Sequence, residues 1–200
     1  MQTIMIIRHA EKPVAGIRDR SVCIDGFHAR HELTVRGWQR AAALVRFFVP
    51  PHDRPAGHPI RTPASIFAAA ATETSPSLRS QRTVQPLAEA LHLAVNCSLA
   101  EGEETQLAAA LVLAASPVLV AWHHHSIPAL VREIAGQSLA REGAGQSLAC
   151  PADWPDDRFD VVWILQRAAP EQSWSFAQHA QLLVPRDRGD VIQSAVRAVP

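Results

Sequence analysis

The sequence predicts an α/β fold, a three-layer α/β/α arrangement with a mostly parallel central sheet. Two observations support this prediction. The first is a series of short apolar runs typical of buried strands, and the second is a series of segments whose apolar residues recur at helical spacing. The two kinds of segment alternate along the chain. Such alternation places helices on both faces of a parallel sheet. The 200 residues are 48% hydrophobic and 19% charged, which is enough for one domain over residues 1–200 with a substantial core.

The first half of the chain contains two predicted strands and two predicted helices. Thr3–Ile7 is a β-prone run, and the polar residues after it lie at its carboxyl end, where open α/β sheets bind ligands. Thr34 is predicted to cap a helix through Trp38–Phe48, which a pair of prolines ends. Ser65–Ala71 is short and apolar, as a buried strand would be, and Val84–Leu91 has the i, i+3, i+4, i+7 spacing of a helix.

The second half continues the alternation. Leu107–Ala114 and Ile127–Ala135 have helical spacing, and Val118–Trp122 between them is a short buried strand followed by three histidines. Phe159–Gln166 and Trp174–Val184 are predicted to be strands. The last of these alternates polar and apolar side chains, as expected of a half-exposed edge strand.

Charge and composition exclude several classes of function. With 19 positive and 19 negative side chains the formal net charge is zero, which argues against a general nucleic-acid or membrane-surface binder. Lys12 is the sole lysine and follows no glycine-rich turn, which excludes a P-loop. The longest apolar run, Leu107–Ala115, is far shorter than the ~20 residues that span a bilayer. Cys23, Cys97 and Cys150 form no paired motif, so a reducing, cytoplasmic location is expected.

Four motifs succeed one another along the chain. RHAEK ends the first strand at Arg8, and LTVRGWQRA, from Leu33, begins the first helix. SLRSQRT begins at Ser77, and VLVAWHHHSIPALV begins at Val118. In this order and spacing the motifs resemble those of the histidine phosphatase superfamily, also called phosphoglycerate mutase-like, in its short bacterial branch. The resemblance runs from end to end and implies the phosphoglycerate mutase-like form of the α/β fold.

The resemblance implies a metal-independent phosphatase, with no cofactor, that acts through a phosphohistidine. His9 would be the nucleophile, Arg8 and Arg79 the phosphate clamps, and His123 a second imidazole that donates to the phosphate oxygens. These residue types suit the chemistry. A neutral imidazole can attack phosphorus at pH 7 if an acceptor such as a backbone carbonyl holds its other nitrogen. Guanidinium groups present paired donors and stay charged.

The general acid that protonates the leaving oxygen is harder to place. In many members of the superfamily a carboxylate lies between the second arginine and the second histidine. The matching segment is Glu101-Gly-Glu103-Glu104, within which Glu104 or Glu103 is expected to be the acid, although acidic side chains also favour helix N-termini. Glu11 is a second candidate because it follows the nucleophile closely. The candidates for contact with substrate are Glu11, Arg36, Glu103 and His124, although a solvated Arg36 is the favoured interpretation.

The chain departs from the family pattern at several points. Arg82 is inserted between the glutamine and threonine of the third motif, and Trp122 replaces the glycine that usually precedes the second histidine. The residues between Glu11 and Leu33 do not match the substrate-recognition segment of true phosphoglycerate mutases. A phosphatase is therefore favoured over a mutase, which is an isomerase.

Other readings of the motifs explain less. The run from His123 to His125 suggests a metal site, but adjacent residues on an extended strand point to opposite faces, and no acidic cluster has metal-ligand spacing. None of the three cysteines begins the C-x5-R motif of cysteine phosphatases, because no arginine lies six residues after any of them. A non-catalytic phosphate- or phosphoprotein-binding module remains the alternative of a different class. The expected partner is a phosphorylated small molecule or a phosphoprotein, without nucleic acid or membrane, and the oligomeric state is left open.

Overall fold

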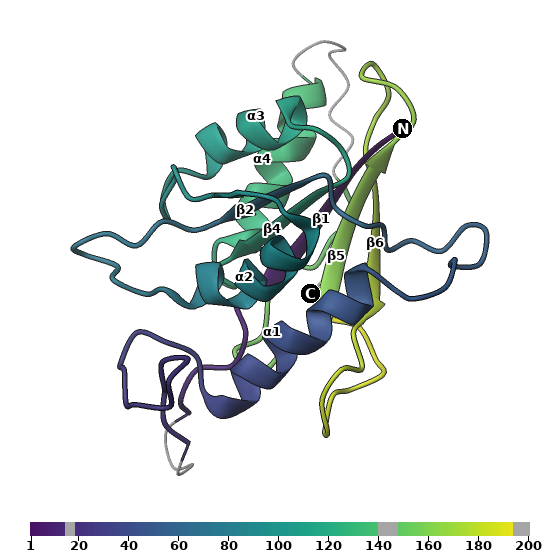
Figure 1. Cartoon of the computed structure of the whole chain (residues 1–200). Coiled ribbons are helices and arrows are strands. Elements are labelled where there is room, and N and C mark those ends of the chain that lie inside the picture. The colour runs from purple at the N-terminus through teal and green to yellow at the C-terminus, as the bar shows by residue number, and fades with distance from the viewer. Residues whose placement is uncertain (15–18, 140–147, 194–200) are drawn as a thin grey trace, which may run out of the picture.

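A computed structural model describes residues 1–14, 19–139 and 148–193, without the side chains of residues 137–139. Within these residues six strands form one sheet and four helices cover it (Figure 1). The strands are β1 (Gln2–Arg8), β2 (Ser65–Ala68), β3 (Val95–Asn96), β4 (Val118–Trp122), β5 (Val161–Arg167) and β6 (Ser175–Ala180). The helices are α1 (Val35–Phe48), α2 (Arg79–Leu91), α3 (Glu104–Leu113) and α4 (Ile127–Leu139).

The sheet is mixed, with the strand order β3-β2-β4-β1-β5-β6. The pairs β3–β2, β2–β4 and β4–β1 are parallel, whereas β5 is antiparallel to both β1 and β6. The predicted α/β fold with a mostly parallel sheet is therefore confirmed. β6 is an edge strand, as its alternating side chains predicted.

Helices cover both faces of the sheet, and the pleat of β1 shows how. Ile4 and Ile6 pack with residues of α3 and α4, and Met5 and Ile7 pack with residues of α1 and α2. Figure 1 shows α3 and α4 grouped together, with α1 and α2 on the opposite side of the sheet. A central strand buried on both faces carries a continuous apolar run rather than an alternating one, as β1 does. No helix within the described ranges is long and apolar enough to cross a bilayer.

Several element ends differ from the predictions. β2 ends at Ala68 rather than Ala71, and α2 begins at Arg79, five residues before its first periodic apolar position. The first turn of α2 is polar, so apolar spacing could not mark it. The short strand β3 was not predicted, because two residues carry no periodic signal.

The start of α1 packs tightly against the segment that follows β1. Thr34 caps α1 as predicted, because its hydroxyl accepts a hydrogen bond from the backbone N–H of Gly37 at 3.1 Å. A Cβ on Gly37 would lie 2.8 Å from the carbonyl oxygen of Glu11. The glycine therefore lets the helix approach the RHAEK segment closely, which brings α1 to the end of β1.

Candidate active site

Two histidines meet where two neighbouring parallel strands end. His9 follows β1 and His123 follows β4, and the register of these strands pairs Arg8 with Trp122. The pairing continues for one more residue, because the backbone N–H of His9 donates to the carbonyl of Trp122 at 3.1 Å. The two imidazole centroids lie 5.9 Å apart, and His9 and His123 are only 4% and 8% exposed. The structure thus brings these two predicted residues together.

The hydrogen bond of His9 defines its tautomer. Its Nδ1 lies 2.8 Å from the carbonyl oxygen of Ala10, and a carbonyl can only accept, so Nδ1 carries the proton. Burial, followed by the positive charge of Arg8, lowers the pKa of His9 well below its ordinary value. The ring is therefore neutral at pH 7, with its lone pair on Nε2. The carbonyl of Ala10 is an acceptor of the kind expected to hold the second ring nitrogen of His9.

Helix α2 holds the backbone beside His9. The N–H of Ala10 donates to Oγ1 of Thr83 at 2.7 Å, and the Thr83 hydroxyl donates in turn to the carbonyl of Arg79 at 2.7 Å. Both hydrogen bonds are short, and the Thr83 side chain is buried, so they fix the strand end relative to the start of α2. Thr83 belongs to the third motif, but no sequence pattern predicts its contact with Ala10.

The Arg8 side chain is completely buried and donates hydrogen bonds to the loop before β5. Its Nη1 donates to the carbonyls of Pro155, Asp156 and Arg158 at 3.3, 2.6 and 3.2 Å. Its guanidinium lies 3.8 Å from the ring centre of Phe159. Burial lowers the pKa of Arg8 to about 10, so the group stays charged at neutral pH. Its Nε has no hydrogen-bond partner among the residues described.

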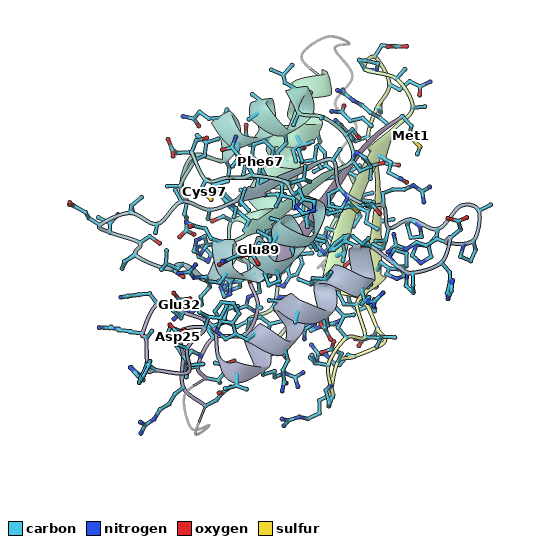
Figure 2. The ribbon with its side chains drawn as sticks, viewed as in Figure 1. Met1, Asp25, Glu32, Phe67, Glu89 and Cys97 are labelled. Atoms are coloured by element: carbon cyan, nitrogen blue, oxygen red, sulfur yellow. The ribbon has the colours of Figure 1, made fainter. Side chains whose placement is uncertain are left out.

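Arg79 is the first residue of α2 and is held by the loop before α1. Its Nε donates to the carbonyl of Glu32 at 3.1 Å and its Nη2 to that of Arg30 at 2.8 Å. Glu32 lies in that loop, on the opposite side of the molecule from Met1 (Figure 2). The charge of Arg79 contributes to the lowered pKa values of both His9 and His123. Arg79 therefore lies near the imidazole pair, although loop carbonyls occupy two of its donors.

The carboxylate in contact with His123 belongs to Glu101. Its Oε2 lies 3.9 Å from Nδ1 of His123, and its Oε1 accepts a hydrogen bond from the hydroxyl of Ser126 at 2.9 Å and contacts the ring of His125. Burial lowers the pKa of His123, and the charge of Glu101 opposes that shift.

The two glutamates that the sequence favoured as acids make other contacts. Oε1 of Glu104 accepts a hydrogen bond from the indole N–H of Trp122 at 3.0 Å, and Oε2 of Glu103 accepts one from the backbone of Ala100 at 2.7 Å. Glu104 is still close enough for its charge to act on His123. Among the three glutamates of this segment, Glu101 could have been identified only from the fold of the loop, which carries no periodic signal.

Glu11 and Arg36 take part in a buried ion network. Both carboxylate oxygens of Glu11 accept hydrogen bonds from Arg40, and Oε1 also accepts one from Nε of Arg36 at 2.9 Å. Nη2 of the buried Arg40 lies 2.6 Å from Asp187, which also binds Arg36. The network joins the segment after β1 to α1 and to the segment after β6. Arg40 and Asp187 were not among the predicted site residues.

A cavity of about 480 Å³ adjoins this network. Its walls include Glu11, Lys12, Arg36 and Phe159. The predicted residues Arg8, His9, Arg79 and His123 are not among the walls of this cavity. His124 lies near Arg8, with its Nε2 2.9 Å from Oδ1 of Asp156. Over the part of the chain that the structure describes, no group of three or more His, Cys, Asp or Glu side chains is arranged to hold a metal ion.

Comparisons with known proteins support the fold. No family model matches the sequence, and no curated protein matches it. Among solved structures, the candidate phosphohistidine phosphatase SixA from Nakamurella multipartitia is similar, with a TM-score of 0.50 and 19% sequence identity. The match covers 90% of this chain and 96% of the other. At this identity the likeness establishes a shared α/β architecture.

The neutral state of His9 predicts a pH dependence of stability. Its pKa is lower in the folded chain than in the unfolded chain, so as the pH falls below about 6.5 the unfolded chain takes up the proton first and stability is lost. Between pH 7 and pH 5 we expect His9 to account for up to about 2 kcal/mol of that loss. Urea unfolding at both pH values should show a smaller loss for His9→Asn. The exposed His52 provides the control, and an equal loss in wild type, His9→Asn and His52→Asn would contradict the assignment.

Proposed function

We propose that this chain is a phosphatase of the histidine phosphatase superfamily, a single domain over residues 1–200, that hydrolyses phosphoric monoesters or phosphohistidine without a metal ion. The observation that supports the proposal most is the pair of buried imidazoles, with His9 neutral and its Nε2 free to attack. The four sequence motifs and the similarity to a candidate phosphohistidine phosphatase add to that support. The similarity to a candidate phosphohistidine phosphatase adds a phosphoprotein to the proposed substrates, beside a small phosphomonoester.

The proposed reaction has two steps. Nε2 of His9 forms a bond to phosphorus as the bond from phosphorus to the leaving oxygen breaks, and a general acid gives that oxygen its proton. The carboxylate left by the acid then takes a proton from water as the water oxygen attacks phosphorus, the P–N bond breaks with its electron pair returning to Nε2 of His9, and inorganic phosphate leaves. Donors around the three phosphate oxygens stabilise the charge in both steps.

His123, Arg8 and Arg79 are the proposed donors. His123 adjoins the nucleophile directly. Arg8 has a buried Nε–H without a partner in the described chain, and we expect a bound phosphate oxygen to satisfy this donor or its neighbour Nη2. Arg79 would exchange a loop carbonyl for a phosphate oxygen, which gives it a charge-assisted hydrogen bond in place of a neutral one.

Glu101 is the proposed general acid, in place of the expected Glu104. Its carboxylate contacts His123, whereas one oxygen of Glu104 accepts from Trp122 and from the backbone of Gly102. An acid must lie within reach of the leaving oxygen, and the contact of Glu101 with His123 meets that requirement better than the hydrogen bond of Glu104 with the Trp122 indole N–H.

Replacing the nucleophile should abolish turnover. We expect His9→Ala to lower the kcat for an aryl phosphate by at least about 10³-fold, because the covalent step loses its attacking atom. His52→Ala, which removes an exposed histidine, should match wild type. An excess of chelator should leave wild-type activity unchanged. Undiminished turnover by His9→Ala would contradict the phosphohistidine route, and loss of activity to chelator would contradict the metal-independent one.

A comparison of leaving groups identifies the acid. With a poorly leaving alkyl phosphate, Glu101→Gln should lower kcat/KM by about 10² or more, because the leaving oxygen then departs unprotonated. With a nitrophenyl phosphate the same change should matter little. Glu104→Gln serves as the matched variant and should affect both substrates alike. A leaving-group dependence confined to Glu104→Gln would assign the acid to Glu104 instead.

A further inference from the structure

Three donors from two segments meet at one carboxylate oxygen, and one of them, Arg8, directly precedes His9. Oδ1 of Asp156 lies 3.4 Å from Nη2 of Arg8, 3.4 Å from Nζ of Lys12 and 2.9 Å from Nε2 of His124. Arg8 ends β1, Lys12 lies four residues further on, and His124 follows β4. Donors from both strand ends that carry the imidazole pair therefore converge on a single acceptor atom.

The donors and the acceptor differ in how firmly they are held. The Arg8 side chain is fully buried and that of His124 is 16% exposed, whereas that of Asp156 is 76% exposed. Arg8 and His124 are therefore held within the protein, whereas the Asp156 carboxylate lies at the surface. An exposed ion pair contributes little free energy, so this side chain can leave at small cost. The charge of Lys12 is the main cause that lowers the pKa of Asp156, so the carboxylate is an anion at neutral pH rather than an acid.

We infer that Arg8, Lys12 and His124 form a binding position for one oxygen of the substrate's phosphate, and that the Asp156 carboxylate fills this position in the free protein. The inference rests on the proposed function, since it places the phosphate beside His9. A phosphate oxygen accepts the same charge-assisted hydrogen bonds as a carboxylate oxygen, and the phosphate group carries more negative charge. Substrate therefore competes with Asp156, and Lys12 becomes a ligand of the phosphate.

The chain offers a matched control in the next residue. The side chain of Asp157 is 71% exposed and pairs with Arg188 at 3.3 Å. Its charge also acts on Arg8, but no contact joins it to Arg8, Lys12 or His124. Removing the charge of Asp157 therefore changes the long-range field without emptying the proposed position.

The test measures the affinity for inorganic phosphate by calorimetry. We expect phosphate to bind Asp156→Asn and Asp156→Ala about 3- to 10-fold more tightly than wild type, because the internal competitor is weakened or gone. Asp157→Asn should bind within about twofold of wild type. Because the Asp156 side chain is exposed, neither change should disturb folding. Unchanged or weaker binding in both Asp156 variants, an equal gain in Asp157→Asn, or no binding by any form of the protein would overturn the inference.

Substitution of Lys12 provides a second, independent test of the shared position. In wild type, Lys12→Met removes a contact from both the free state and the bound state, so its effect on phosphate affinity should be small. In the Asp156→Ala background only the bound state loses the contact, so the same change should weaken binding several-fold more. An effect of equal size in the two backgrounds would contradict the shared position.

These measurements separate the inference from the proposed function, because binding of phosphate requires no turnover. If His9→Ala stayed active while the Asp156 variants bound phosphate more tightly, the phosphohistidine mechanism would fail and the binding position would stand. If turnover depended on His9 and the Asp156 variants gained no affinity, the binding position alone would fail.

Discussion

The parallel register between β1 and β4 is the constraint on which the candidate site depends. It sets Arg8 opposite Trp122, and so brings His9 and His123, one residue beyond each strand, to adjacent positions. Both strands are buried on both faces, so a slip by one residue would turn every side chain to the opposite face and disrupt its packing. The hydrophobic core therefore fixes the spacing of the two imidazoles, and the chemistry needs no long loop to bring them together.

Burial has opposite consequences for the two residues that end β1. For His9 it favours the neutral ring that a nucleophile requires, and the Ala10 carbonyl settles which nitrogen keeps the proton. For Arg8 it makes a charge costly, and three loop carbonyls together with the Phe159 ring offset that cost. The loop before β5 is thus part of the site, although it lies about 150 residues away in the sequence.

The buried network around Arg40 steadies the same segment from the other side. Removing one partner of such a network leaves an uncompensated charge and typically costs about 3–5 kcal/mol. Gly37 and Thr83 add close packing and a short hydrogen bond. Consequently α1, α2 and the segment after β6 all help to hold the segment between Arg8 and Lys12 in place.

The α/β class and the meeting of His9 with His123 could be predicted because each histidine lies just beyond an apolar run, and parallel strands end at one edge of a sheet. Glu11, Glu101 and Asp156 mark where prediction stopped. The partners of Glu11 and Asp156 lie far along the chain. The sequence does not distinguish Glu101 from Glu103 and Glu104, because only the folded loop determines which of the three contacts His123. The start of α2 was not predicted because its first turn is polar, and apolar spacing marks only helical turns that carry apolar residues.

The most direct test of the account is to trap the covalent intermediate. The protein would be mixed with an aryl phosphate carrying a radioactive phosphoryl group, quenched within the first turnover, and digested to locate the label. The phosphohistidine mechanism predicts a label that is stable to alkali, labile to acid as a P–N bond is, and confined to the peptide that contains His9. A label stable to acid, a label on another residue, or equal labelling of His9→Ala would contradict it.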